Sequence, residues 1–425
     1  MKYIVSLIII LLFVSCGTSS DDTTNKKYTI IEESDDIINR LNEIRQKSGM
    51  IKLTTATSLV KSSYNHAYYL DTNNLSGHIE EKDKKNFTGE HASNRVLYTG
   101  FRTKFVSENV SIWQKTKNDS LEGLMSAIYH RFGFLDFEIN TIGFAKIGYV
   151  YVYNMSNSDI NDLCYGNNYE KSGYVSLCKD KSFRIQYSKY INTLNKTINS
   201  NPMYVIYPYR NQKDVQTVFF EETPDPLPTY NVSGYPISIE FNKNHYNMEN
   251  FSINSFIIYD NNNNVLELAK DFLDSNSILS MDNDVNKHIT DKYKYAIFPA
   301  KRLEYGKTYN VEFSYNINGN SKKIKWSFTT KTLPNLININ NETNEITIDN
   351  NKSYNLFIEP INKNDILNKR SIVCFYKNSI IPKLDISFYD RNTIKLKVEG
   401  EDINYCNLKL YKNNIETRTI KININ

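Results

Sequence analysis

The six histidines of this chain are the first candidates for chemistry, because imidazole exchanges protons near neutral pH and is a common metal ligand. His130 stands in the stretch SAIYHRFGFL, at the end of an apolar run, where an imidazole could do chemistry, hold a ligand or pack. Ser76 and Ser107 lie near histidines in the sequence, but neither lies in the G-x-S-x-G turn that presents a serine nucleophile. We therefore predict no catalytic residue of this kind.

The other histidines of the chain have simpler interpretations. His66 lies on the apolar face of a predicted helix, so we expect a buried histidine with satisfied hydrogen bonds. His91, beside Glu90 in a polar loop, is expected to be solvated, and His245 and His288 are expected on the surface of a β region.

Five cysteines indicate an exported protein with two disulfides. With Cys16 reserved for a lipid, four remain, and four cysteines allow three connectivities. Pairing within each predicted domain favours Cys164 with Cys178 and Cys374 with Cys406. No C-x-x-C spacing occurs, which makes a metal site at these cysteines the weaker interpretation.

The N-terminus, MKYIVSLIIILLFVSC, is typical of an export signal. Its apolar run over residues 3–14 is shorter than the roughly 20 residues that a transmembrane helix needs. Ser15 before Cys16 resembles the bacterial lipobox, in which the cysteine is lipidated and becomes the mature N-terminus. We predict a lipoprotein signal peptide at residues 1–16, a polar tether at residues 17–28, and a lipid anchor in a bacterial membrane, at the outer membrane or cell surface.

Length and charge narrow the class of protein. At roughly 100 to 200 residues per domain, the 425-residue chain forms two to three domains. The formal charge of +4 is spread thinly, without a long run of lysine and arginine, so a nucleic-acid partner is not expected. The 32 tyrosines suggest β structure with asparagine-rich turns, although an AT-rich genome produces the same bias.

The elements fall into three regions. Apolar residues at helical spacing predict four helices in the first, over residues 34–49, 57–70, 93–100 and 121–130, followed by the strand-like IGFAKIGYVYVYNM. A loop-rich insertion is predicted at residues 157–198, and a Pro-rich linker at residues 221–230. Short alternating strands then predict a β-sandwich at residues 231–332 and a second β-rich domain at residues 333–425. The order AIFPAKRLEYGKTYNVEF followed by WSFTT resembles the bacterial Ig-like modules of surface proteins, which implies that the first of these is an Ig-like domain.

Four segments of the first region occur in a familiar order. They are LNEIRQKSGMIKLTTATSLVKSSYNHAYYL, NNLSGH, RVLYTGF with SENVSIW, and LMSAIYHRFGFLD. Together they resemble the CAP superfamily (cysteine-rich secretory, antigen 5, pathogenesis-related), in its bacterial SCP-like branch. The resemblance implies a CAP domain over residues 29–220, and therefore an α+β chain in which an α-β-α sandwich precedes one or two β-sandwiches.

The resemblance also implies a site. His78, Glu108 and His130 would face one another across the CAP cavity as ligand-binding residues. Eukaryotic relatives have a tryptophan and, four residues later, a glutamate where this chain has Leu124 and Ile128, so the fourth member of the site is missing. Gly133 also stands where bacterial members commonly have asparagine.

Two imidazoles and a carboxylate suit zinc or a similar divalent ion with an open coordination position, so His78, Glu108 and His130 are also candidate metal ligands. Without a metal, the same groups form a cluster in which Glu108 stabilises a protonated histidine. Arg95 and Arg131 are interpreted as structural residues that bond carboxylates or backbone carbonyls, with Asp136 as the nearest carboxylate for Arg131.

Three functions remain open at this stage. The leading prediction is an extracytoplasmic lipoprotein that binds a small lipophilic ligand or an envelope partner in the CAP groove without catalysis. The first alternative is a metal-dependent hydrolase that uses the His/Glu cavity. The second is an adhesin or envelope structural protein that acts through its β domains.

Overall fold

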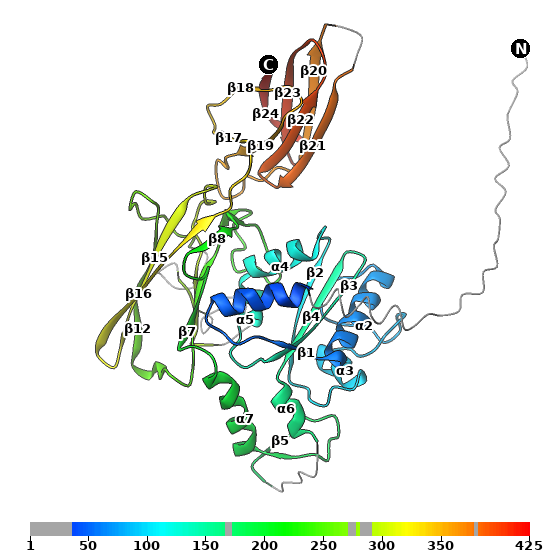
Figure 1. Cartoon of the computed structure of the whole chain (residues 1–425), viewed down its shortest axis with the longest axis vertical. Helices are drawn as coiled ribbons and strands as arrows, with labels where there is room; N and C mark the ends of the chain where they lie inside the picture. The colour runs from blue at the N-terminus through cyan, green and yellow to red at the C-terminus, as the bar shows by residue number, and fades with distance from the viewer. Residues whose placement is uncertain (1–35, 166–171, 271–277, 281–290, 378–380) are drawn as a thin grey trace, which may run out of the picture.

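The computed structural model describes residues 36–165, 172–270, 278–280, 291–377 and 381–425. Within these ranges the chain forms an N-terminal α/β domain, a central β domain and a C-terminal β domain that extends away from the other two (Figure 1). The predicted signal peptide, the tether, the lipidation site at Cys16 and His288 lie outside the described residues.

The first domain is a sheet between two layers of helices. Its strand order is β1 (Thr54–Thr55), β3 (Thr141–Ile147), β4 (Val150–Ser156) and β2 (Val106–Ile112). Helices α2 (Thr57–Asn73) and α3 (Ala92–Tyr98) cover one face, and the helix of residues 36–47 lies with α4 (Lys117–Ser126) and α5 (Ile128–Phe134) on the other. This is the predicted α-β-α sandwich. None of the described helices is both long and apolar enough to cross a membrane.

Close packing of α2 on β3 depends on one glycine. A Cβ atom at Gly143 would lie 2.2 Å from the backbone of Leu59 and of Val60, so only glycine fits at this position. The predicted helix at residues 121–130 is wrong in one respect. The helix ends at Ala127, which has extended backbone angles, and a separate helix, α5, begins after it and contains His130.

The predicted insertion at residues 157–198 is more regular than expected. It holds α6 (Ser158–Leu163), the short strands β5 (Tyr174–Val175) and β6 (Ile185–Gln186), and α7 (Tyr187–Asn199). The disulfide between Cys164 and Cys178 joins α6 to the following segment, with a Cα separation of 5.5 Å.

The central domain is a β-sandwich of two four-stranded sheets. One sheet has the order β13 (Leu279–Ser280), β14 (Lys294–Ile297), β11 (Ile237–Phe241), β7 (Tyr204–Tyr207), and the other has the order β12 (Phe251–Tyr259), β15 (Thr308–Ile317), β16 (Asn320–Thr330), β8 (Gln212–Val215). The predicted boundary at residue 220 is therefore wrong. Strands β7 and β8 precede it, yet they complete the sheets of the central domain by pairing with β11 and β16.

The Pro-rich segment at residues 221–230 is not a free linker. It lies between β9 (Val218–Phe219) and β10 (Ser233–Gly234), which pair with each other. Leu227 is completely buried, in a cluster with Phe219, Phe298 and residues of α5. Proline excludes helix and central strand here, but it does not prevent an irregular segment from burying its apolar side chains.

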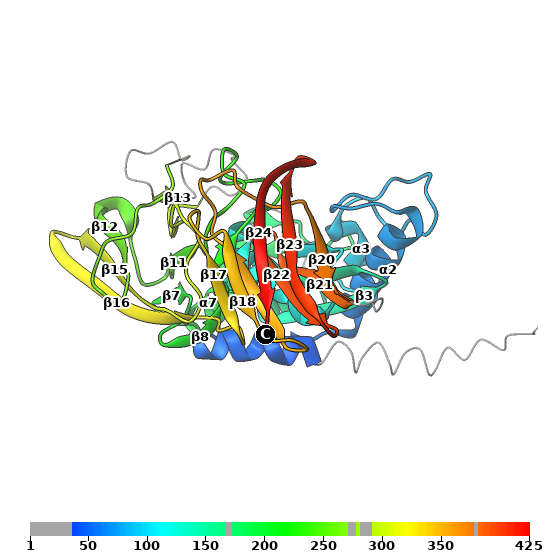
Figure 2. The ribbon, with the colours of Figure 1, turned by 90° about the horizontal axis from the view of Figure 1, so that it is seen from above.

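The C-terminal domain is a second β-sandwich, whose strands are drawn in yellow to red in Figure 2. Its buried apolar residues form a core of their own. Its sheets have the orders β17 (Leu336–Ile339), β19 (Ser353–Ile358), β22 (Thr393–Glu399), β21 (Lys383–Asp390) and β18 (Glu345–Ile348), β24 (Ile415–Ile424), β23 (Ile403–Lys412), β20 (Lys369–Tyr376). The disulfide between Cys374 and Cys406 joins directly opposed residues of β20 and β23. Both local cysteine pairings that the sequence favours are present.

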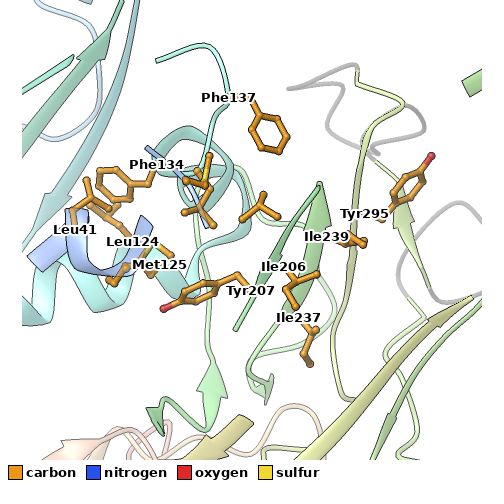
Figure 3. Packing of buried hydrophobic residues seen from close by; sticks show 14 of the residues in the cluster. Leu41, Leu124, Met125, Phe134, Phe137, Ile206, Tyr207, Ile237, Ile239 and Tyr295 are labelled. Atoms are coloured by element: carbon orange, nitrogen blue, oxygen red, sulfur yellow. The ribbon is translucent and has the colours of Figure 1, made fainter. Parts of the chain in front are cut away.

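The first two domains share a hydrophobic core. Leu124, Met125 and Phe134 of the helical layer lie in one cluster with Ile206 and Ile237 of the central domain (Figure 3). The C-terminal domain contacts the rest of the chain through several residues, among them Arg302, whose guanidinium donates to the carboxylate oxygens of Asp390 at 2.8 and 2.6 Å, and a buried cluster of Tyr305, Leu333 and Phe357.

Truncation of one buried side chain tests the packing of the Pro-rich segment. Leu227→Ala should lower the free energy of unfolding by about 2–5 kcal/mol, because a large buried side chain is lost from a shared core. Asn231→Ala, at the exposed position directly after this segment, is the control. Denaturant unfolding followed by tryptophan fluorescence measures the difference, and equal stability of the two variants would mean that the segment is a free linker.

Candidate functional site

Glu108 is directed into the space between α2 and α3 by the alternation of side chains along β2. Val106 and Val110, two residues to either side, pack against residues of these two helices. Successive side chains of a strand point to opposite faces, so Glu108 shares their face and Asn109 takes the other. The carboxylate is therefore inserted into the α2/α3 layer.

Arg95 of α3 holds that carboxylate. Its Nη2 donates to both oxygens of Glu108, at 2.6 and 2.8 Å, and the two side chains are 0% and 3% exposed. Nη1 donates to the carbonyls of His78, Gly89 and Glu90. Arg95 thus has the structural role that the sequence predicts, and it also ties the loop of residues 77–91 to β2.

Two histidines complete the contacts of Glu108. The Nδ1 atom of His78 lies 3.1 Å from Oε1, and the Nε2 atom of His66 lies 3.7 Å from the same oxygen. The predicted proximity of His78 and Glu108 is therefore present. The fully buried His66 was expected only as a satisfied core histidine, which it is, but its ring also belongs to this cluster.

Glu80 is a member that sequence reasoning missed. Its Oε1 lies 3.0 Å from Nδ1 of His66, and its Oε2 accepts the backbone N–H groups of Thr88 and Gly89 at 2.7 and 3.2 Å. Nε2 of His66 faces the carbonyl of Gly77 at 3.1 Å, so both ring nitrogens lie within hydrogen-bonding distance of acceptor oxygens. No motif in the sequence marks Glu80.

The charge on Glu108 is stabilised strongly. Burial acts to raise the pKa of this carboxyl, but the hydrogen bond from His78 and the positive charges of His66, Arg95 and His78 outweigh it and lower the pKa to about 2. A carboxylate with so low a pKa is a poor general base near neutral pH.

The exposed side of the cluster is formed by His78 and the residue that follows it. The side chain of His78 is 46% exposed, and Ile79 is 49% exposed. The charged interior thus fixes a loop that presents an imidazole beside an apolar side chain. Of the remaining histidines, His91 and His245 are exposed, as expected.

The prediction that His130 faces His78 and Glu108 is wrong. Its Nδ1 lies 3.1 Å from Oε2 of Glu222, which also accepts the backbone N–H groups of Ile128 and Tyr129 at 2.5 and 3.2 Å. The His130 carbonyl accepts a hydrogen bond from Asn109, which places the backbone of His130 on the opposite face of β2 from Glu108. Burial raises the pKa of Glu222 despite these contacts.

Arg131 has the structural role that the sequence predicts, and it bonds backbone carbonyls, although Asp136 is not its partner. The fully buried guanidinium donates to the carbonyls of Met125 and Pro236 at 2.7 and 2.8 Å and to Ser238 at 3.1 Å. Met125 belongs to α4, whereas Pro236 and Ser238 belong to the central domain. His130 and Arg131 therefore fasten the two domains together.

The predicted zinc ligands do not form one set. Both oxygens of Glu108 hold Arg95, so a metal ion would have to displace a buried guanidinium, and His130 lies across the sheet. In the part of the chain that the structure describes, no group of three or more His, Cys, Asp or Glu side chains could hold a metal ion.

Comparison with known proteins identifies the first domain. The family model described as "Cysteine-rich secretory protein family" (CAP) matches residues 38–154, which confirms the resemblance noted in the sequence. No curated protein matches the chain.

Solved structures give partial matches. An extracellular SCP-domain protein from Bacillus anthracis is 18% identical, with 33% of this chain and 45% of that chain covered and a TM-score of 0.29. This chain thus spans less than half of that protein. An outer surface protein from Borrelia burgdorferi is 14% identical, with 32% and 94% covered and a TM-score of 0.26. Tandem Ig domains of titin are 10% identical, with 52% and 96% covered and a TM-score of 0.18.

Neutralising Glu108 tests its place in the cluster. Glu108→Gln should cost about 3–5 kcal/mol of stability near neutral pH, because the buried Arg95 would lose its closest counter-charge and keep only Glu80, whose Oε1 lies 3.7 Å from its Nε. Glu90→Gln, at a side chain that is 63% exposed, should change stability by less than about 0.5 kcal/mol.

The same variant gives a pH dependence with a defined sign. Since folding lowers the pKa of Glu108 from 4.5 to about 2, its contribution is fully present above pH 4.5 and is lost as the pH falls toward 2. The free energies of unfolding of the wild-type chain and of Glu108→Gln, measured across this pH range, should become equal at the acid end. A constant difference would remove Glu108 as the titrating group.

Proposed function

We propose that this chain, in which residues 38–154 form a CAP domain, is an exported surface protein that binds a small lipophilic ligand without converting it. Two disulfides are typical of proteins that fold outside the cytoplasm, and they support export. The proposal that the ligand is bound without catalysis rests on the buried ion pair of Arg95 and Glu108. A carboxylate that is 3% exposed, accepts hydrogen bonds on both oxygens and has a pKa of about 2 is a poor base for activating water.

The surface beside this pair supports the binding part. Ile79 offers an exposed apolar side chain, and the neighbouring His78 offers a polar ring, a combination that suits a ligand with an alkyl chain and a polar head. Both residues lie on the loop whose backbone Arg95 holds, so the surface is organised before the ligand arrives.

A fluorescent fatty acid, dansylaminoundecanoic acid, tests this proposal. We expect saturable binding to the chain of residues 17–425 and a roughly tenfold weaker Kd for Ile79→Ser, because about 1.5 kcal/mol or more of apolar contact would be lost. Ile381→Ser, at a residue of the C-terminal domain that is 78% exposed, is the matched control. Equal affinity of the two variants, or no saturable binding, would contradict the proposal.

Anchoring by a lipid at Cys16 is a separate part of the proposal. The lipobox-like sequence before Cys16 supports it, and Cys16→Ala should move the protein from the membrane fraction to the soluble fraction. Cell fractionation with immunoblotting measures this, with Ser15→Ala as a control that keeps a small residue before the cysteine. Retention of the Cys16→Ala protein in the membrane would rule out the anchor.

A further inference from the structure

A cleft with a volume of about 360 Å³ lies between the first two domains, away from the Glu108 cluster. One wall is formed by the helix of residues 36–47 and by α4, and the other by the segment of residues 207–216 with Tyr235 and Lys331. The Tyr235 hydroxyl donates to the Met125 carbonyl at 3.0 Å, which fixes the two walls relative to each other. The volume is within the range of small-molecule sites, roughly 300–1,000 Å³.

The charge of the cleft is positive. Its lining includes four cationic and two acidic side chains, namely Arg40, Lys47, Lys213, Lys331, Glu122 and Asp214. Arg40 and Lys47 share Glu43, a neighbour on their own helix. Lys213 and Lys331, from the opposite wall, form no ion pair with any acidic residue in the described ranges. Lys213 donates instead to Thr329, and Nζ of Lys331 lies 5.5 Å from the ring centroid of Tyr389. Neither lysine is therefore neutralised by an ion pair, and both charges can attract an anion.

A tyrosine ring lies between the cationic side chains. Tyr209 is half-buried, and Nζ of Lys47 lies 5.9 Å from its ring centroid. The side chain of Gln212 fixes this tyrosine by accepting its backbone N–H at 2.9 Å and by donating to the Tyr207 hydroxyl at 3.1 Å. The negative face of such a fixed ring attracts the weakly positive C–H groups of a sugar.

Hydrogen-bonding groups and an unusual backbone complete the site. The exposed amide of Asn118 lies on the α4 wall, and Gln216 reaches across the cleft to donate to Glu122. Asn211 and Asp214, which flank Gln212 and Lys213, both have a left-handed backbone with φ of 57°. Such conformations are less costly for Asn and Asp than for other side chains, and they concentrate at functional sites.

We propose that this cleft binds an acidic saccharide. Its carboxylate lies between Lys213 and Lys331, its ring stacks on Tyr209, and its hydroxyls bond to Asn118 and Gln216. A purely lipophilic ligand would desolvate the two lysines without replacing their lost interactions with water, so it does not suit this cleft. The site is distinct from the surface at His78 and Ile79, and it depends on the attachment of the central domain.

Titration calorimetry of the chain of residues 17–425 with digalacturonate tests the proposal. Lys331→Met and Tyr209→Ala should each weaken binding about tenfold, because the first variant loses a charge-assisted hydrogen bond and the second loses a stacked ring. Lys395→Met and Tyr149→Ala, at exposed positions elsewhere, should leave the affinity unchanged. Thermal unfolding of each variant confirms that the fold is retained.

Three further titrations define the ligand chemistry. Maltose, which has no charge, and inorganic phosphate, which has no sugar ring, should each bind at least tenfold more weakly than digalacturonate. Equal binding of maltose would overturn the role of the lysines, and equal binding of phosphate would overturn the role of the saccharide. Absence of digalacturonate binding, or equal binding by the wild-type chain and both cleft variants, would overturn the proposal. Ile79→Ser should bind digalacturonate normally, so this result is independent of the fatty-acid test.

Discussion

The contact between Arg95 and Glu108 is the constraint on which the CAP domain is organised. Both charges are buried, and their mutual attraction offsets the free energy that each loses when it leaves water. Arg95 also uses three backbone carbonyls of the loop at residues 78–90, which links β2, α3 and that loop. Loss of either charge would therefore disturb both the interior and the surface next to it.

A second pair, His130 with Glu222, connects helix α5 to the Pro-rich segment. Glu222 reaches α5 from the Pro-rich segment, accepts two backbone N–H groups at the start of the helix and contacts the His130 ring. Arg131, the next residue, spans to the central domain. Residues that resemble a ligand-binding motif in sequence are thus used to join domains, and the Pro-rich segment acts as part of that joint.

The architecture explains why two separate recognition surfaces are proposed. One lies on the CAP domain alone, beside a charge cluster that is closed to catalysis. The other needs both domains, because Lys213, Lys331 and Tyr209 come from the central domain, whereas Arg40 and Lys47 come from the helix of residues 36–47. The shared hydrophobic core keeps these walls in a fixed relation, which reduces the entropy that a ligand would otherwise have to overcome.

The sequence alone determined the features that depend on local pattern. Helical spacing and alternating apolar residues located the sandwich layers, cysteine positions indicated two local disulfides, and ordered motifs indicated the CAP domain with His78 near Glu108. Only the tertiary structure decided which side chains and strands, distant in sequence, contact one another. Glu80 and Glu222 have no motif, His130 meets a carboxylate 92 residues away, and strands β7 and β8 pair beyond the predicted boundary. Such contacts are selected by packing and by the need to satisfy buried charge, and neither leaves a periodic signal in the chain.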